Sequence, residues 1–362
     1  MARTPRKSIS FAIALATTAA FGPITVASAQ DVDFEGETVE IMVNFAAGGG
    51  TDTAARLVAP YIAKHLPGNP NVIVTNRPGA GGNTGVGYLI DSVAPNGMTI
   101  GYFSGTLMFL AQADDSLPAR AKDLHFVAGR SVNHVLVTST DAGLTADTLP
   151  GYSDRFFLTA NTPDNAQALR LRLLCSAIGA DGFRLVSGYT TQGRMVSAVR
   201  AQEAEIAITN DSYFGSNREA ITGDGVLVPL GQMGEFIDGK IVAQKGLEDI
   251  PVFDNIWRSA APDSVDSAAY RGWETFHKAM AMQHAFALPI ETPQSYQDAW
   301  ETAILEAYTD PDYVAQLEKI GVPVPSAISA DAIEALLEEN MQVFASEDVR
   351  SALDEAIAAN ME

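Results

Sequence analysis

Two strand-like runs near the start of the chain each lead through a glycine-rich turn into a helical run. The strand at residues 41–45 precedes the turn 46–52, and the strand at 72–74 precedes the turn 76–85. A third strand-like run follows at 98–103. This alternation predicts an α/β fold with a parallel sheet flanked by helices, in which ligands gather beyond the carboxyl ends of the strands. Both glycine turns fall at such ends.

The glycine turns have the chemistry to hold an anion. Backbone N–H groups at the start of a helix lack partners within the helix and carry partial positive charge, and glycine lets a ligand come close to the backbone. Two such turns side by side would form a cradle about the size of a carboxylate. The candidate ligand-binding residues of this cradle are Ala47, Gly48, Gly49, Gly50, Thr51, Asp52, Asn83, Thr84 and Gly85.

Each turn also has a purely structural explanation, a tight turn that needs positive φ angles. The first turn is not a P-loop, because Thr51 and Asp52 follow Gly50 where a lysine is required. The second fails the dinucleotide fingerprint, because Thr84 stands where its third glycine would be. Asp52 is expected to cap the helix rather than bind a ligand ammonium or hydroxyl group, and Arg77 to brace its loop rather than bind a carboxylate.

Residues 1–29 have the pattern of a secretory signal peptide. Three cations precede an apolar run at 11–21, and a small-residue cleavage motif ends at Ala29. An uncleaved anchor is the alternative, but a Gly-Pro break leaves the apolar run too short to span a membrane. The only cysteine, Cys175, is far from the cleavage motif, so it gives no lipid anchor there and no internal disulfide. The sequence therefore predicts export to the periplasm.

The chain is strongly acidic, with a formal net charge of −21 that becomes −24 once the three leader cations are removed. This charge argues against nucleic acid and anionic membranes as partners. It also repels anionic ligands at long range, so an anion site must supply its own local positive potential.

Motifs for catalysis or metal binding are thin. The sequence has no Gly-x-Ser-x-Gly elbow, no His-Glu-x-x-His motif and no cysteine pair. His277 and His284 could share a helix face and a metal, but packing explains them better. An acid–base pair of His134 with Asp211 is the best enzyme alternative, although nothing in the sequence orients it. We expect no catalytic residue, no metal and no cofactor, and we expect Cys175 to be a buried small hydrophobe.

Further elements can be placed from periodicity. The strand-like runs are 132–139, 156–160, 185–186, 206–209 and 226–230. The helical runs are 164–178, 193–202, 268–284, 295–309, 312–320 and 331–343.

With these residues in view, the chain resembles the periplasmic solute receptors of tripartite tricarboxylate transporters, the TctC or Bug-type binding proteins. The segments that carry the resemblance are 39–52, 76–85, 94–100, 188–193, 205–211, 287–293 and 309–311. The paired N-terminal motifs are the most specific of these, and the whole set covers most of the mature chain.

The resemblance implies a type II-like Venus-flytrap fold of two lobes, each a mainly parallel sheet flanked by helices, with the ligand between them. We expect lobe 1 to comprise residues 30–135 and 233–362, the latter with the C-terminal helices, and lobe 2 to comprise 136–232. The residues implied to contact the ligand from the second lobe are Asn161, Thr162, Thr190, Thr191 and Asp211. Asp211 would serve either as hinge support or as a ligand for a hydroxyl or ammonium group.

The family implies capture of a small carboxylate and its delivery by a monomer to a two-component membrane permease, without enzymatic turnover. A sensor module for a membrane receptor is the alternative, and an exported hydrolase or isomerase is a weaker one. Ala47 replaces a proline frequent in the family, and Thr190 and Thr191 replace a common lysine-glycine pair. These departures leave ligand identity open and would suit a smaller, more polar or less charged ligand.

Overall fold

The computed structural model describes residues 32–104, 123–160, 166–237, 240–280 and 284–358. The expected signal peptide and the candidate ligand residues Asn161 and Thr162 lie outside these ranges. Within them, every helix is too short or too polar to cross a membrane.

The first sheet contains the two strands that precede the glycine turns. Its strands are Thr38–Val43 (β1), Asn71–Asn76 (β2), Thr99–Ser104 (β3), Leu124–Arg130 (β4), His284–Pro289 (β12) and Ala327–Ser329 (β13). They lie in the order β13-β4-β12-β3-β1-β2. Because β1 pairs in parallel with both β2 and β3, the turns after β1 and β2 leave the same edge of the sheet.

The second sheet is built from the middle of the chain. Its strands are His134–Ser139 (β5), Phe156–Thr159 (β6), Phe183–Val186 (β7), Ile206–Asn210 (β8) and Leu227–Gln232 (β9). They lie in the order β7-β6-β8-β5-β9, and a separate hairpin joins Glu235–Ile237 (β10) to Lys240–Val242 (β11). In this sheet β6 pairs in parallel with β7 and β8, as the strand–helix alternation predicts.

Both sheets are mixed rather than mainly parallel. In the first sheet β12 runs antiparallel to β3 and β4, and β13 antiparallel to β4. In the second, β5 runs antiparallel to β8 and β9. The reason is the path of the chain: β5 enters its sheet directly from β4, and β12 returns to the first sheet from the second. A strand that enters from the other sheet, such as β5 or β12, runs away from the boundary between the two sheets. The neighbouring strands that are followed by a helix run toward that boundary.

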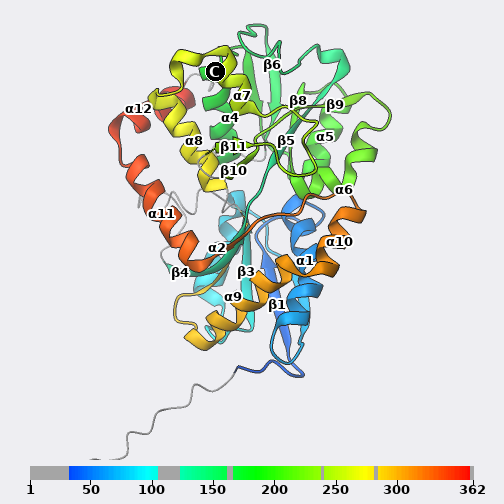
Figure 1. Ribbon diagram of the computed structural model, residues 1–362, viewed down its shortest axis with the longest axis vertical. Coiled ribbons are helices and arrows are strands. Elements are labelled where there is room, and N and C mark those ends of the chain that lie inside the picture. Colours follow the sequence, from blue (N-terminus) through cyan, green and yellow to red (C-terminus); the bar gives the residue numbers. More distant parts are fainter. Residues whose placement is uncertain (1–31, 105–122, 161–165, 238–239, 281–283, 359–362) are drawn as a thin grey trace, which may run out of the picture. The chain divides into compact units, whose positions relative to one another are not determined.

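The helices between the strands cover the faces of the sheets (Figure 1). Those that accompany the first half of the chain are Gly50–His65 (α1), Asn83–Ser92 (α2), Ala166–Ala177 (α4), Gln192–Arg200 (α5) and Asp211–Thr222 (α6). Those of the second half are Phe253–Ala260 (α7), Ala268–Met280 (α8), Gln294–Thr309 (α9), Pro311–Lys319 (α10), Ala330–Phe344 (α11) and Glu347–Ala358 (α12). Short 3₁₀ turns lie at Ala80–Gly82, Thr140–Ala142 and Pro262–Ser264.

Side-chain packing assigns the C-terminal helices to different cores. Helix α1 packs on α9, and Trp300 of α9 is buried in the core of the first sheet. Helices α8 and α12 instead pack on α4, and Trp257, Trp273 and Val349 are buried with the core of the second sheet. The lobe boundaries stay a prediction, but these contacts favour counting α7, α8 and α12 with the second lobe rather than the first.

Candidate functional site

The first glycine turn places three helix-start amides at the end of β1. Thr53 N donates to Gly49 O at 2.9 Å, so the N–H groups of Gly50, Thr51 and Asp52 precede the first hydrogen bond of α1. Gly49 supplies no side-chain cap. Ala47 is exposed and Gly48 adopts φ of +76°, which a residue with a side chain would adopt only under strain. This arrangement is the uncapped helix start that suits an anion.

Asp52 has a structural role in this turn. Its carboxylate accepts the Gly48 N–H at 2.8 Å and Asn76 Nδ2 at 2.9 Å, and it pairs with Arg56 at 3.0 Å. Although burial alone would raise the pKa of Asp52, these hydrogen bonds outweigh that effect and hold the pKa below its ordinary value. Asp52 therefore fastens the turn to the end of β2, and the Gly48 amide is used within the turn rather than offered to a ligand.

The second glycine turn lies beside the first because Asn44 joins them. Asn44 is 1% exposed; its Nδ2 lies 3.4 Å from Gly82 O and 3.0 Å from Ser104 O, and its Oδ1 accepts from Ser104 N at 3.0 Å. The amides of Asn83 and Thr84 donate within their own turn, to Ala80 O and Gly79 O. The second turn therefore has fewer donors to offer than its sequence suggests. Arg77 braces this turn, with its guanidinium 3.5 Å over the ring of Tyr88.

Gly85 is required by this close packing, which gives a direct test. A Cβ on Gly85 would lie 2.8 Å from Asn44 Cβ and 3.0 Å from the carbonyl oxygen of Arg77, whereas a Cβ on Gly87 in the same helix would meet nothing within 4 Å. We expect Gly85→Ala to lower the free energy of unfolding by about 1–3 kcal/mol through overpacking. Gly87→Ala should raise it by about 0.5–1 kcal/mol, because alanine favours helix. Urea denaturation measures both, and equal effects would contradict the described contact.

Turns of the second sheet meet the first glycine turn. A Cβ on Gly50 would lie 2.2 Å from Nδ2 of Asn210, so the Asn210 side chain rests against the Gly50 backbone. Asn210 caps α6 by accepting from Tyr213 N, and its own N–H donates to Gln192 Oε1 at 3.2 Å. Gln192 follows Thr191 directly, so the structure brings the 46–52, 190–192 and 210–211 turns together.

The threonines of the second sheet differ in their availability. Thr191 is half-buried and caps α5, because its hydroxyl accepts from Arg194 N at 3.3 Å. Thr190 is exposed. Thr51, on the other side of the contact, is only 6% exposed, so Thr51→Val is a gentler probe of its hydroxyl than a bulky residue would be.

Asp211 supports the crossing between the sheets. It is fully buried and accepts from Arg130 Nη2 at 2.5 Å, from Gln244 Nε2 at 3.2 Å and from Asn133 N at 3.4 Å. Burial alone would lower the pKa of Arg130, but the Asp211 carboxylate outweighs it and raises that pKa above its ordinary value. Of the two roles expected for Asp211, these contacts favour hinge support.

The acid–base pair considered from sequence does not form. Asp211 is already held by Arg130, and burial lowers the pKa of His134 well below its ordinary value, with Arg170 the largest charge contribution. Cys175 is buried, as expected, and burial raises the pKa of its thiol to about 12, which makes it unreactive at neutral pH. Among the described residues, acidic, histidine and cysteine side chains form no cluster that could hold a metal ion.

Sequence reasoning missed a buried basic cluster at the boundary between the sheets. It consists of five side chains, each no more than 3% exposed: Arg130, His134, Arg170, His277 and His284. Each comes from the boundary end of its element, and His284 is the register partner of both Ser104 on β3 and Arg130 on β4. Burial lowers the pKa values of the three histidines well below the ordinary value, so they are neutral at pH 7, and the two arginines carry the positive charge of the cluster.

The signal for this cluster was present in one helix. The sequence of α4, AQALRLRLLCSA, contains two arginines and no acid. Because α4 has no acidic residue three or four positions from its arginines, these arginines cannot form ion pairs within the helix. Their partners must come from other elements of the fold.

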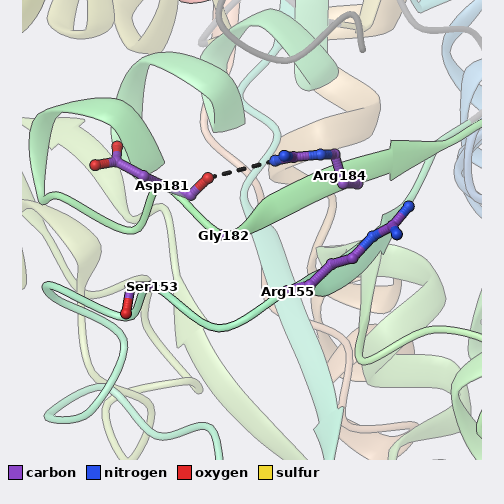
Figure 2. A pocket seen from close by; sticks show the side chains of 5 residues that line it. All are labelled: Ser153, Arg155, Asp181, Gly182 and Arg184. Carbon is purple, nitrogen blue, oxygen red and sulfur yellow. Dashed lines mark hydrogen bonds between the residues drawn. The ribbon is translucent and has the colours of Figure 1, made fainter.

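The structure also has hollows away from the glycine turns. One of about 470 Å³ is bounded by the 131–132 crossing, β10, α8 and β13, and His277 and Lys278 line it. Another of about 430 Å³ is a surface pocket near the start of β6 and β7, shown in Figure 2. There Arg184 donates to the carbonyl of Asp181, and the exposed Arg155 lies against the ring of Phe157. This pocket holds cations that are exposed or bonded to carbonyls, in contrast with the buried cluster.

No family model matches the chain. A curated relative from Cupriavidus necator, described as "UPF0065 protein in gbd 5'region", is 40% identical over 86 residues. The match covers 24% of this chain and about a quarter, 25%, of the relative's length.

Solved structures of binding proteins match nearly the whole chain, each at 18% identity. Periplasmic binding protein BugD aligns with a TM-score of 0.63 over 89% of this chain and 97% of its own. An R. palustris protein solved with adipate aligns with a TM-score of 0.66 over 89% and 99%. MatC from Rhodopseudomonas palustris, with bound malate, aligns with a TM-score of 0.58 over 88% and 98%.

These neighbours confirm the fold expected from the sequence. BugD is described as a periplasmic binding protein, and the other two neighbours were solved with a small carboxylate, adipate or malate. The chain therefore has the two-sheet α/β fold of the periplasmic binding proteins.

Proposed function

We propose that this chain is a periplasmic solute receptor that captures a small organic carboxylate between its two sheets, without chemical turnover. The observation that carries the proposal is the uncapped start of α1 at Gly50, Thr51 and Asp52, where the Asn210 side chain of the second sheet lies against the Gly50 backbone. Helix-start amides bind carboxylate oxygens without any charged side chain.

The surrounding structure supports an anion rather than a cation as the ligand. The chain as a whole is strongly acidic, so its surface repels anions at long range. Within the buried basic cluster, Arg170 has no carboxylate partner in the described part of the chain, and its charge supplies the local positive potential that an anion then needs. Together with the amides of α1, it makes the junction of the sheets a favourable place for negative charge.

We further propose that the captured ligand is delivered to a two-component permease of the tripartite tricarboxylate type, by a monomer released into the periplasm after cleavage near Gln30. The match to a UPF0065 protein and the fold shared with BugD support this assignment. Thr190 and Thr191, in the turn that Asn210 joins to α1, are the proposed contacts from the second sheet.

A thermal-shift screen tests the binding role. The mature protein, freed of ligand by unfolding and refolding, would be heated with carboxylates, amino acids, sugars and metal ions in turn. A ligand at about 100 times its Kd adds about 2.7 kcal/mol of stability to the folded state. We expect carboxylates alone to stabilise the protein. Silence from carboxylates with a response to sugars or metals would contradict the proposal.

Isothermal titration of Thr51→Val with the best carboxylate then locates the site. The variant keeps the shape of the buried side chain and removes its hydroxyl. We expect about a tenfold to hundredfold weaker affinity, because one hydrogen bond to a charged group is lost. Thr190 is exposed on the second sheet, and the affinity of Thr190→Val for the same carboxylate is measured for comparison.

A further inference from the structure

Arg170 carries a positive charge into the interior beside the second sheet without a matching negative charge. The residue is 0% exposed, and its Nε and Nη2 atoms have no hydrogen-bond partner in the described part of the chain. Its Nη1 lies 3.4 Å from Nδ1 of His277, at the long end of hydrogen-bond distance. An imidazole cannot neutralise a guanidinium, and no described carboxylate pairs with Arg170.

The guanidinium remains charged despite its burial. Burial lowers the pKa of Arg170 to about 9, which still leaves the group protonated at neutral pH. A buried charge is costly unless an opposite charge and hydrogen bonds accompany it. By comparison, Arg130 in the same cluster is paired with Asp211. Arg170 is therefore the member of the cluster with unused capacity for an anion.

The position of Arg170 connects it to the candidate site. It lies near the start of α4, and its neighbour His277 lies in the last turn of α8, so both are at the boundary end of the second sheet. The charge of Arg170 acts on His134, whose register partner on β8 is Asn210. Asn210 in turn rests on Gly50 of the amide cradle.

We propose that Arg170, with His277 beside it, binds a second carboxylate of a dicarboxylate ligand whose first carboxylate lies at the amides of α1. This assignment rests on the proposed function and adds the ligand class. The planar guanidinium presents two donors in the spacing of two carboxylate oxygens. Hinge opening of the two-lobed fold gives the ligand access, and closure buries it. The same donors would accept an inorganic anion such as sulfate, so the test must separate the two sources.

The test compares ligands that differ by one charge. Isothermal titration of the refolded mature protein would use succinate, glutarate and adipate, and the monocarboxylates butyrate, pentanoate and hexanoate of the same lengths, at constant ionic strength. Sodium sulfate is the inorganic probe. The variants are Arg170→Met, which keeps an unbranched side chain, and Arg170→Lys, which keeps the charge without the fork. Arg155→Met, in the surface pocket of Figure 2, is the matched control.

We expect wild type to prefer a dicarboxylate over its matched monocarboxylate, and Arg170→Met to lose at least tenfold in dicarboxylate affinity, about 1.4 kcal/mol. Monocarboxylate affinity should not change, Arg170→Lys should fall between, and Arg155→Met should match wild type. The midpoint of urea unfolding of ligand-free Arg170→Met should equal or exceed that of wild type, because a buried unpaired charge has been removed. A structural role for Arg170 would lower it instead.

Other outcomes overturn the assignment in distinguishable ways. Monocarboxylate binding without a dicarboxylate preference, or undiminished dicarboxylate binding by Arg170→Met, refutes the assignment and leaves the proposed function standing. Stabilisation of wild type but not Arg170→Met by sulfate alone, while dicarboxylates bind both equally, assigns Arg170 to an inorganic anion. No binding of any carboxylate rejects the proposed function and this assignment together.

Discussion

Asp211→Ala is expected to lower the free energy of unfolding by about 3–5 kcal/mol, because it leaves Arg130 buried without its counter-charge. Arg130 is 1% exposed, and besides its contact with Asp211 it donates to the Ser212 hydroxyl at 3.2 Å. The Asp211 carboxylate also accepts from Asn133 N and Gln244 Nε2, at the point where the chain crosses between the sheets. The substitution therefore removes contacts from the segment where the chain crosses between the two sheets. Urea denaturation followed by far-UV circular dichroism measures it.

A double variant separates the effect of losing the whole Arg130–Asp211 ion pair from the effect of leaving Arg130 charged and unpaired. Arg130→Met with Asp211→Leu removes both charges and fills similar volume, and such replacements are often neutral or stabilising. We expect the double variant to recover most of the stability that Asp211→Ala loses. If Asp211→Ala alone stays within about 1 kcal/mol of wild type, Arg130 does not depend on this carboxylate, and the hinge role assigned to Asp211 fails.

The N-terminal half of the first sheet was predictable because its sequence is locally consistent. The expected strand at 72–74 and the helical run expected after the second glycine turn appear as Asn71–Asn76 and Asn83–Ser92. Apolar runs, glycine turns and helical spacing all indicate the same structure there. The helical run predicted after the first glycine turn, 46–52, begins within that turn, at Gly50, because Gly49 is extended and acts as the N-cap.

Elements whose structure depends on tertiary packing were missed. Strand β4 has the sequence LHFVAGR, in which histidine, glycine and arginine interrupt the apolar run, yet all but His125 are buried. Residue 284 was assigned to the end of a helix, but it begins β12, which is buried throughout. Helix α6 contains glycine, serine and asparagine, which favour turns over helices. Long-range contacts decide all three.

The candidate site shows the same division. The glycine turns and Asp211 are visible in sequence as patterns, and the structure brings the first turn against Asn210. What no local pattern showed is that Asn44 joins the two glycine turns, or that Arg130, from a missed strand, engages Asp211. The five side chains of the buried basic cluster come from five separate elements, so only the fold reveals that they meet.

Acidification from pH 7.5 to 5.5 is expected to lower the free energy of unfolding by up to about 4 kcal/mol, about 1.4 kcal/mol for each of three histidines. Burial lowers the pKa values of His134, His277 and His284 well below the ordinary value of 6.5, and the charge of Arg170 or Arg130 adds to this effect. As the pH falls through about 6.5, these histidines become protonated in the unfolded chain but stay neutral in the folded chain, so the free energy of unfolding falls with the pH. Glu235, whose pKa burial raises, acts in the opposite direction at lower pH.

Urea denaturation at half-unit pH steps measures this dependence, and His277→Gln isolates one contribution. His277 stacks on Trp273, with ring centroids 5.6 Å apart, and glutamine keeps a polar group of similar size there without a titrating ring. The variant should lose less stability than wild type on acidification, by about 1.4 kcal/mol between pH 7.5 and 5.5. If the variant and wild type showed the same pH dependence, His277 would bind protons equally in the folded and unfolded states, which would contradict the lowered pKa of His277. Because acidification lowers the free energy of unfolding through the histidines next to Arg170, the ligand titrations should be carried out at pH 7.5.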